Sequence, residues 1–363
     1  MAPNRPTIRD VARQAGVSHQ TVSRVINGSE DVLPETRAVV EAAIEELGYR
    51  PSAIARSMAR GSTHTLAIIS PNLTDYTFAS IVEGAEVEAR QHNYFVLSSS
   101  ASDPQSFHDL ADELVGHRRV DGLIVINPYA DDRYMHIPKD FPVVFVGARS
   151  HDELVCSISL DDEKVAYEAT QHLILLGHKR IGLITGPMEE DCSQDRREGF
   201  VRALTEAGMP FDESLVFEGD WSASSGRDAL LDFVKKDNVP TAVFAQNDRM
   251  AMGVMRAARD ANLKVPDQIS VIGVDDMPLS SYFDPPLTTM RQDMPLIGQE
   301  AIRKLIDLIQ NETVEQIVLK LPAQLVVRQS TVKGGDLSSY YPKGKTDPTQ
   351  PYANLFVQFL GEE

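Results

Sequence analysis

The sequence TIRDVARQAGVSHQTVSRVING, residues 7–28, predicts two short helices joined by a tight turn. Thr7 is placed to begin the first helix, with Asp10 as the reciprocal partner of a capping box. Gly16 stands where the chain must leave that helix in a left-handed conformation, and Ser18 is placed to cap the second helix. Apolar residues recur at helical spacing in both segments, so each helix presents one apolar face. The stretch therefore predicts a compact helical pair.

The outward face of the second predicted helix is polar and carries no acidic residue. Its members are His19, Gln20, Ser23, Arg24 and Asn27. In the major groove of DNA, arginine pairs with guanine, and glutamine or asparagine pairs with adenine. A two-helix unit with such a second helix is typical of a DNA-reading head. On the pattern alone, a surface hairpin of mixed polarity is the alternative.

The net charge of −18 is distributed unevenly along the chain. Residues 1–60 hold eight arginines and seven acidic residues, a net charge of +1, which leaves −19 for the remainder. Within residues 1–27, four arginines stand against Asp10 alone. The N-terminal head is therefore locally basic, whereas the body repels phosphate.

Length and composition favour a soluble protein of two or three domains. The chain has 363 residues, 42% of them hydrophobic and 24% charged, and no stretch approaches the roughly 20 apolar residues of a membrane span. The N-terminus lacks the apolar segment of a secretory signal, so we expect a cytoplasmic protein without membrane association. Two cysteines, Cys156 and Cys192, indicate no disulfide framework.

The residues after the helical pair predict a third helix and then a short, isolated one. Pro34 suits the first position of a helix that runs to about Leu47. Residues 52–60 have the composition of one further short helix before Gly61, but alone it is too short to be stable in water. We expect it to become ordered only on a partner.

From His64 onward, apolar strand-like segments alternate with amphipathic helical segments. The expected strands are Leu66–Ser70, Phe95–Ser98, Gly122–Ile126, Val143–Val146, Ile181–Thr185, Ala242–Ala245 and Ser270–Val274. The expected helices are 78–92, 105–118, 163–177, 195–208, 223–236, 248–262 and 295–310. Such alternation indicates parallel sheets with helices on both faces. It occurs twice, in residues 64–160 and 163–290, so we expect two similar lobes that residues 291–332 complete.

Seven segments of the chain closely resemble the LacI family of regulators, the lactose and purine repressor type. They follow the family's order and spacing over about residues 7–332: TIRDVARQAGVSHQTVSRVING (7–28), RPSAIARSMARG (50–61), LGHKRIGLITGP (176–187), DRREGF (195–200), NDRMAMG (247–253), SVIGVDDMPLSSYFDPPLTTMRQD (270–293) and VVRQST (326–331). The resemblance implies an N-terminal all-α helix-turn-helix head at 6–51, a hinge helix at 52–62, and an α/β core of the periplasmic-binding-protein type at 63–332. Its two doubly wound parallel-sheet lobes are expected at 63–161 with 292–322, and at 162–291 with 323–332.

The resemblance assigns DNA contacts to the head and to the hinge helix. In the family, the second helix of the head reads a half-site in the major groove, a role that falls here on His19, Gln20 and Arg24. Contacts to phosphates and flanking base edges are assigned to four other residues: Thr7, Ser18, Ser23 and Asn27. The family's paired hinge helices push an apolar wedge into the minor groove, and Met58 occupies that position, with Ala55 as a further expected contact.

The resemblance also implies an effector pocket between the two lobes. Four polar residues from different segments are expected to hold ligand oxygens: Asn127, Arg196, Asn247 and Asp275. Sheets of this type bind ligands beyond the carboxyl ends of their strands, where all four are expected to meet. The other expected pocket residues are Asp75, Ile81, Trp221, Gln292 and Met294. Trp221 is the only tryptophan and suits stacking on a sugar ring, with a core aromatic as the alternative.

Other features argue against an enzyme and narrow the resemblance. Gly147 replaces an aspartate that many members of the family carry, which removes one expected ligand contact. The adjacent carboxylates Asp161–Asp162 and Asp275–Asp276 point to opposite faces of an extended backbone, so neither makes an acid/base pair by itself. The nine histidines show no metal-ligand spacing. We expect no enzymatic activity, no cofactor and no metal.

The family pattern predicts a homodimer that binds a pseudo-palindromic operator and a small molecule. A sugar is the class of small molecule that we favour. It implies repression of carbohydrate-utilisation genes that the sugar relieves. A purine or other co-repressor is the alternative, and a sugar-binding protein or enzyme of similar fold is a more remote one. Residues 333–363 lie outside the resemblance and contain no leucine heptad, so we expect a mobile tail and not a tetramer-forming one.

Overall fold

The computed structural model describes residues 6–29, 31–50, 61–126, 137–147, 156–310 and 318–332. Several predictions fall outside these residues: the hinge helix up to residue 60 with Ala55 and Met58, the pocket residue Asn127, and the tail 333–363. The described residues form two compact units, a head that runs to Thr65 and includes Arg118–Asp121, and a core made of the rest. None of the described helices combines the length and the apolar composition that a membrane span requires.

The head consists of three helices whose ends follow the sequence signals. They are α1 (Ile8–Ala15), α2 (His19–Ile26) and α3 (Pro34–Leu47). The Asp10 carboxylate accepts hydrogen bonds from the backbone nitrogen and the hydroxyl of Thr7, at 2.9 and 2.7 Å. The Ser18 hydroxyl accepts from the backbone nitrogen of Thr21 at 3.1 Å, and Gly16 has a φ of 67°. The predicted caps and turn are confirmed.

The hydrophobic core of the head is contained within its own three helices. Val11, Val22 and Val40 contribute one fully buried side chain from each helix. The remaining apolar side chains of this cluster all lie between Ile8 and Tyr49. The head therefore has a core of its own, made from one short continuous stretch of chain.

Lobe 1 of the core is a six-stranded parallel sheet covered by helices. Its strand order is β11-β5-β4-β3-β1-β2. The strands are β1 (Thr65–Ser70), β2 (Phe95–Ser100), β3 (Gly122–Ile126), β4 (Val143–Val146), β5 (Cys156–Leu160) and β11 (Val318–Leu321). The helices are α5 (Tyr76–Gln91), α6 (Pro104–Ala111), which continues as the π-helical turn η1 (Asp112–Gly116), and α11 (Met294–Gln310).

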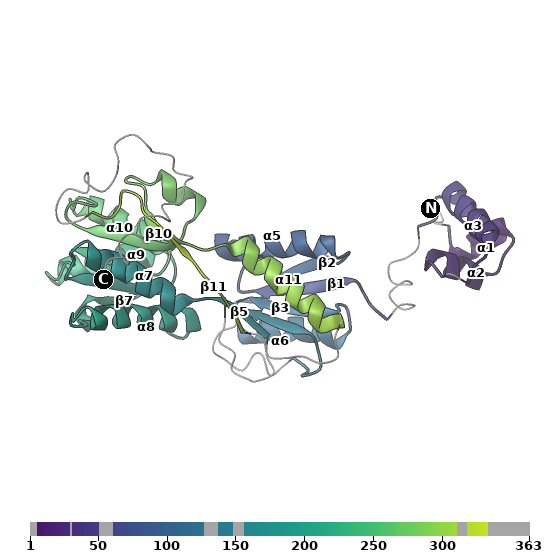
Figure 1. Ribbon diagram of the computed structural model, residues 1–363, viewed down its shortest axis with the longest axis horizontal. Coiled ribbons are helices and arrows are strands. Elements are labelled where there is room, and N and C mark those ends of the chain that lie inside the picture. Colours follow the sequence, from purple (N-terminus) through teal and green to yellow (C-terminus); the bar gives the residue numbers. More distant parts are fainter. Residues whose placement is uncertain are drawn as a thin grey trace, which may run out of the picture. The chain divides into compact units, whose positions relative to one another are not determined.

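Helices α5 and α11 pack together on one face of this sheet (Figure 1). Alternate residues of a strand point to opposite faces, and Leu66 and Ile68 of β1 point toward these two helices. Gly84 permits the close approach, since a Cβ there would lie 2.1 Å from the carbonyl oxygen of Pro295. A larger residue at position 84 would push α5 and the start of α11 apart.

Lobe 2 has the same architecture with one antiparallel edge. Its strand order is β12-β10-β9-β8-β6-β7, and β12 runs antiparallel to β10. The strands are β6 (Ile181–Thr185), β7 (Val216–Glu218), β8 (Ala242–Ala245), β9 (Ser270–Asp275), β10 (Thr288–Arg291) and β12 (Gln324–Val326). The helices are α7 (Asp162–Leu175), α8 (Asp191–Glu206), α9 (Ala223–Lys235) and α10 (Asp248–Asp260), with the 3₁₀ turns η3 (Glu213–Leu215) and η4 (Pro278–Tyr282).

Both faces of the lobe 2 sheet are covered by helices, as Figure 1 shows. Val243 and Ala245 of β8 pack with α9 and α10. The alternate residues Ala242 and Phe244 pack with α7 and α8. A strand that is buried on both faces is a continuous apolar stretch in the sequence, and this is why β8 could be predicted from the sequence.

The chain crosses between the lobes three times, between β5 and α7, between β10 and α11, and between β11 and β12. The last segment thus adds one edge strand to each sheet. The prediction omitted five strands: β5, β7, β10, β11 and β12. These are short, and most mix polar with apolar residues, as in CSISL and VLKL.

Candidate ligand pocket and DNA-reading surface

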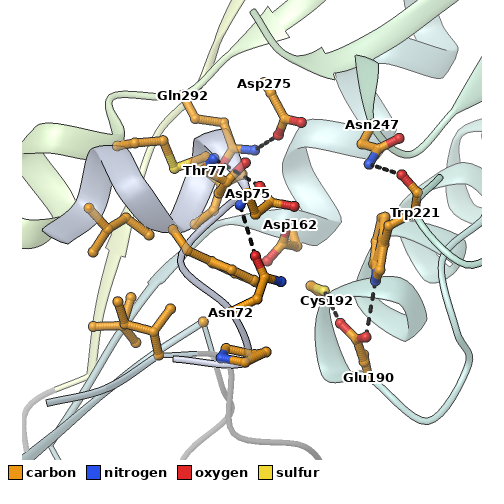
Figure 2. Close-up of a pocket in the computed structure, with 18 of the residues that line it drawn as sticks. Asn72, Asp75, Thr77, Asp162, Glu190, Cys192, Trp221, Asn247, Asp275 and Gln292 are labelled. Carbon is orange, nitrogen blue, oxygen red and sulfur yellow. Dashed lines mark hydrogen bonds between the residues drawn. The ribbon is translucent and has the colours of Figure 1, made fainter. Parts of the chain in front are cut away.

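A pocket of about 460 Å³ lies in the core, lined by residues of both lobes (Figure 2). Its size falls within the range of about 300–1,000 Å³ that is usual for small-molecule sites. Eight of the nine predicted pocket residues line it: Asp75, Ile81, Arg196, Trp221, Asn247, Asp275, Gln292 and Met294. The ninth, Asn127, lies outside the described residues.

Arg196, on the second turn of α8, is the buried cation of the pocket, with 6% of its surface exposed. Its Nε atom donates to Oδ1 of Asp162 at 2.7 Å, and its Nη1 atom donates to the backbone carbonyl of Gln246. Burial disfavours the guanidinium charge, but nearby acidic groups, Asp162 foremost, outweigh burial and raise the pKa of Arg196. A guanidinium has five N–H donors, so Arg196 keeps further donors for a ligand.

Asp275 closes strand β9 and lies in the pocket with Gln292, which follows β10. The Gln292 Nε2 atom donates to Oδ1 of Asp275 at 2.7 Å. Burial, together with the charge of nearby Asp248, raises the pKa of Asp275 well above its usual value. The carboxyl of Asp275 has a second oxygen that can accept a hydrogen bond, and the amide of Gln292 has a second N–H that can donate one. The pair therefore offers both kinds of partner to a ligand.

Asn247 caps a helix in addition to lining the pocket. It is the N-cap of α10, where its Oδ1 atom accepts from the backbone nitrogen of Met250 at 2.8 Å. Its Nδ2 atom donates to the backbone carbonyl of Trp221 at 3.0 Å. The amide group has a second N–H, and this N–H is the part of Asn247 that can serve a ligand.

The Trp221 ring is half-buried between the core of lobe 2 and the pocket. Its indole Nε1 atom donates to Oε1 of Glu190 at 3.0 Å (Figure 2). A Cβ at Gly186 would lie 2.1 Å from the ring, so only glycine leaves room for it. The ring thus packs against the lobe and also lines the pocket.

An ion pair links the two lobes beside the pocket. Nη2 of Arg249, in the first turn of α10, lies 2.5 Å from Oδ2 of Asp75, the N-cap of α5. Oδ1 of Asp75 accepts from the backbone nitrogen of Thr77 at 2.9 Å. Asp75 was predicted, but its partner Arg249 was not, although it lies two residues after Asn247 in the N-D-R motif.

Sequence reasoning missed further lining residues: Asp162, Glu190, Cys192, Asp220 and Arg249. Helix α8 begins at Asp191, four residues before the predicted start at 195, so Cys192 lies one turn before Arg196 on the same face. That spacing was the available signal. Asp276 accepts from Arg291 at 2.6 Å and from Arg328 at 2.5 Å, whereas Asp275 accepts from Gln292, so these two carboxylates have different partners. The expected extended backbone is not found at either pair, because Asp275 and Asp276 have positive φ and Asp162 is the first residue of α7. Gly147 lines the pocket with a φ of 76°, which favours glycine.

The predicted DNA contacts of the head lie on its solvent face. Six are exposed: Thr7, Ser18, His19, Gln20, Arg24 and Asn27. Ser23 is half-buried, and Val22 and Val25 of the same helix point into the core. Helix α2 thus presents a polar ridge without an acidic side chain, as major-groove recognition requires.

Comparison with known proteins gives matches to the head and the core. The family described as "Bacterial regulatory proteins, lacI family" matches residues 7–52, and "Periplasmic binding protein-like domain" matches residues 170–331. Catabolite control protein A of Priestia megaterium is 38% identical over 329 residues, which cover 90% of this chain and 99% of that protein. The chain belongs to the LacI family of bacterial regulatory proteins.

Solved structures of LacI-family members resemble the chain over nearly its whole length. The lac repressor dimer, bound to operator and the anti-inducer ONPF, has a TM-score of 0.83 and 34% identity, covering 91% of this chain and all of that one. The CelR–cellobiose complex has a TM-score of 0.70 and 33% identity, covering 90% of this chain and all of that one. This LacI-family chain is a DNA-binding transcriptional regulator and not an enzyme.

Proposed function

We propose that this regulator is a cytoplasmic, homodimeric repressor of carbohydrate-utilisation genes whose hold on a pseudo-palindromic operator is relieved by a small sugar. The observation that carries the proposal is the pocket, where Arg196, Asn247 and Asp275 converge with the Trp221 ring. Each sugar hydroxyl is both donor and acceptor, and buried polar groups must be paired. The pocket supplies guanidinium and amide donors, a carboxyl, and an aromatic face for the apolar side of the ring. The CelR–cellobiose complex supports a sugar here.

Exposed apolar side chains support a homodimer. Phe95 on the edge strand β2 is 75% exposed, and Leu279 and Tyr282 on η4 are 61% and 83% exposed. Native proteins usually protect an apolar sheet edge, and exposed apolar patches mark interaction sites. A second copy of the chain covers these side chains and supplies the second head that a two-fold symmetric operator needs. The lac repressor structure above is such a dimer on operator.

The proposed switch is a change in the angle between the lobes. A ligand that binds the conformation with one inter-lobe angle more tightly shifts the population toward that conformation. The spacing of the paired heads then either fits the operator or does not. A coupling of about 1–3 kcal/mol, typical of allostery, changes operator affinity roughly 5–150-fold. Because the body is strongly acidic, affinity comes from the heads and hinges, and it is expected to fall steeply with salt.

The test is an anisotropy titration of a fluorescent operator in the presence of increasing cellobiose and other saccharides. We expect at least one saccharide to raise the operator dissociation constant by roughly 5–150-fold. Arg196→Ala removes this response and leaves operator binding, whereas Arg197→Ala, whose side chain pairs with Glu213 and does not line the pocket, keeps the response. A saccharide or purine that tightens operator binding instead would establish a co-repressor. Operator binding that no saccharide alters contradicts the proposal.

A further inference from the structure

The ionic groups of the pocket are mostly acidic. Six carboxylates line it: Asp75, Asp162, Glu189, Glu190, Asp220 and Asp275. Among the described lining residues, two arginines, Arg196 and Arg249, are the only cationic side chains. A ligand that enters the pocket therefore meets a surplus of negative charge.

Both arginines already hold acidic partners. Arg196 donates to Asp162 and to the Gln246 carbonyl, and Arg249 donates to Asp75. A phosphate or carboxylate ligand would have to compete with these contacts, because anion sites depend on guanidinium groups that can turn toward the ligand. Arg196 keeps further N–H donors for a ligand, but the charge of each arginine is already paired with a carboxylate of the pocket.

At three of the helix N-termini beside the pocket, one backbone N–H group is already capped by a side chain. Backbone N–H groups at such ends bind phosphate when they are free. At α5, α9 and α10, the chain's own side chains accept these hydrogen bonds: Asp75 from Thr77, Ser222 from Ser225, and Asn247 from Met250. At α8, the N-cap Glu190 and the first helical residue Asp191 carry charges that oppose an anionic ligand.

The acidic surplus does not depend on the most buried carboxyls. Burial raises the pKa of Asp162 and of Asp275. With both protonated, four carboxylates still face two guanidinium groups. Asp220 stays ionised, because hydrogen bonds from Ser222 lower its pKa.

We infer that the pocket selects an uncharged sugar and rejects phosphorylated and carboxylated sugars. The inference rests on the proposed function and adds the charge class of its effector. Its physical basis is like-charge repulsion in a cavity whose carboxylates outnumber its guanidinium groups and whose two guanidinium charges are already paired.

Trp221 provides the readout, since it is the only tryptophan and lines the pocket. Its emission is followed while the full-length protein is titrated with compounds paired by charge: cellobiose against cellobionate, glucose against glucose 6-phosphate, and inosine against inosine monophosphate. Hypoxanthine is added as a further uncharged compound. We expect the charged member of a binding pair to bind at least about tenfold more weakly, and the gap to narrow as salt screens the repulsion.

A charge-removal variant tests the cause. Glu189 and Asp220 are exposed lining residues, so Glu189→Gln with Asp220→Asn is expected to preserve the fold. The double variant should reduce the preference for the uncharged compound several-fold. Asp228→Asn, which removes an exposed carboxylate of α9 that does not line the pocket, should leave the preference unchanged.

The outcomes separate the two proposals. If a phosphorylated or carboxylated sugar binds as tightly as its uncharged counterpart, the charge inference is wrong and the sugar proposal stands. If only hypoxanthine binds, the sugar proposal is wrong and the preference for an uncharged ligand stands. A preference that survives unchanged in the double variant contradicts the proposed cause. Emission that none of the compounds alters contradicts both.

Discussion

The guanidinium of Arg249 lies 2.5 Å from the carboxylate of Asp75, and this contact joins the start of α10 in lobe 2 to the start of α5 in lobe 1. Both side chains also line the pocket. A contact that spans the lobes at the site where ligand is proposed to bind stabilises one inter-lobe angle over others. Its strength thus contributes to the equilibrium on which an effector acts.

Loss of this ion pair should weaken effector binding modestly. Asp75→Asn removes the charge but keeps an oxygen that can cap α5, and Arg249→Gln removes the other partner. Because the Arg249 side chain is 37% exposed, solvent screens the pair, and we expect each change to weaken binding about 2–5-fold. The double variant should lose little more than either single variant. Fluorescence titrations of the four proteins measure this coupling, and additive losses would show that the pair does not act as a unit.

Arg196 should matter for stability as well as for binding. Arg196→Ala leaves the buried Asp162 carboxyl without its cation, and breaking such a pair costs about 3–5 kcal/mol. Adding Asp162→Asn removes the stranded charge, so it should restore much of the free energy of unfolding but not the response to sugar. Urea unfolding and operator titration measure the two properties separately. If the double variant responds to sugar, Arg196 is not part of the sugar-binding site.

Arg24 should determine the preference for the operator sequence and contribute little to the stability of the folded protein. It is exposed on α2, so Arg24→Ala is expected to leave the melting temperature nearly unchanged. Loss of a specific arginine–base contact costs about 1–3 kcal/mol, so operator affinity should fall much more than affinity for scrambled DNA. Arg13→Ala, on the first helix, is the comparison and should leave the ratio of the two affinities unchanged. An Arg24→Ala protein with an undiminished ratio would contradict the proposed role of α2.

His172 should destabilise lobe 2 in acid. The Nε2 atom of its ring is hydrogen-bonded to the Thr331 hydroxyl at 3.0 Å. Burial lowers the pKa of His172 from 6.5 to about 4. The folded protein therefore binds this proton less readily than the unfolded chain, so the stability that neutral His172 contributes is complete above about pH 6.5 and is lost as pH falls toward 4. A difference of this size is worth at most about 3 kcal/mol.

Asp248 works in the opposite sense, because burial raises its pKa to about 7 and its contribution is lost as pH rises through that value. The quantity to measure is therefore the difference in the free energy of unfolding between the unmodified protein and His172→Gln at each pH. The contribution of Asp248 is present in both proteins and cancels in this difference. Chemical unfolding at pH values from the unfolded pKa of 6.5 down to the folded pKa of about 4 should show that His172→Gln removes part of the acid sensitivity. Equal pH profiles for the two proteins would contradict this role.

The sequence predicted the central strands of both sheets and missed most of the outer ones. Strands such as β3 and β8 are buried along their whole length and read as continuous apolar runs. Strands β7, β11 and β12 lie at sheet edges, are half-exposed and are only three or four residues long, so they give little periodic signal. Their places depend on pairing with distant strands, which a local pattern does not encode.

The pocket was predicted in the same uneven way. Arg196, Asn247 and Asp275 stand in recognisable motifs beside strands, and the resemblance to the family identified them. Their partners lie far away in sequence, with Asp162 separated from Arg196 by 34 positions and Asp75 from Arg249 by 174. The charge balance of the pocket arises from these long-range pairings, so it emerged only with the fold.

The three crossings of the chain also set the order in which a newly made protein can become functional. The core of the head needs only residues from Ile8 to Tyr49, whereas each sheet of the sensor waits for an edge strand from β11 or β12. Domains generally fold as units during synthesis, beginning at the N-terminus. A chain that ended before residue 318 would thus keep a folded head but lack the edge strand that closes each sheet of the sensor.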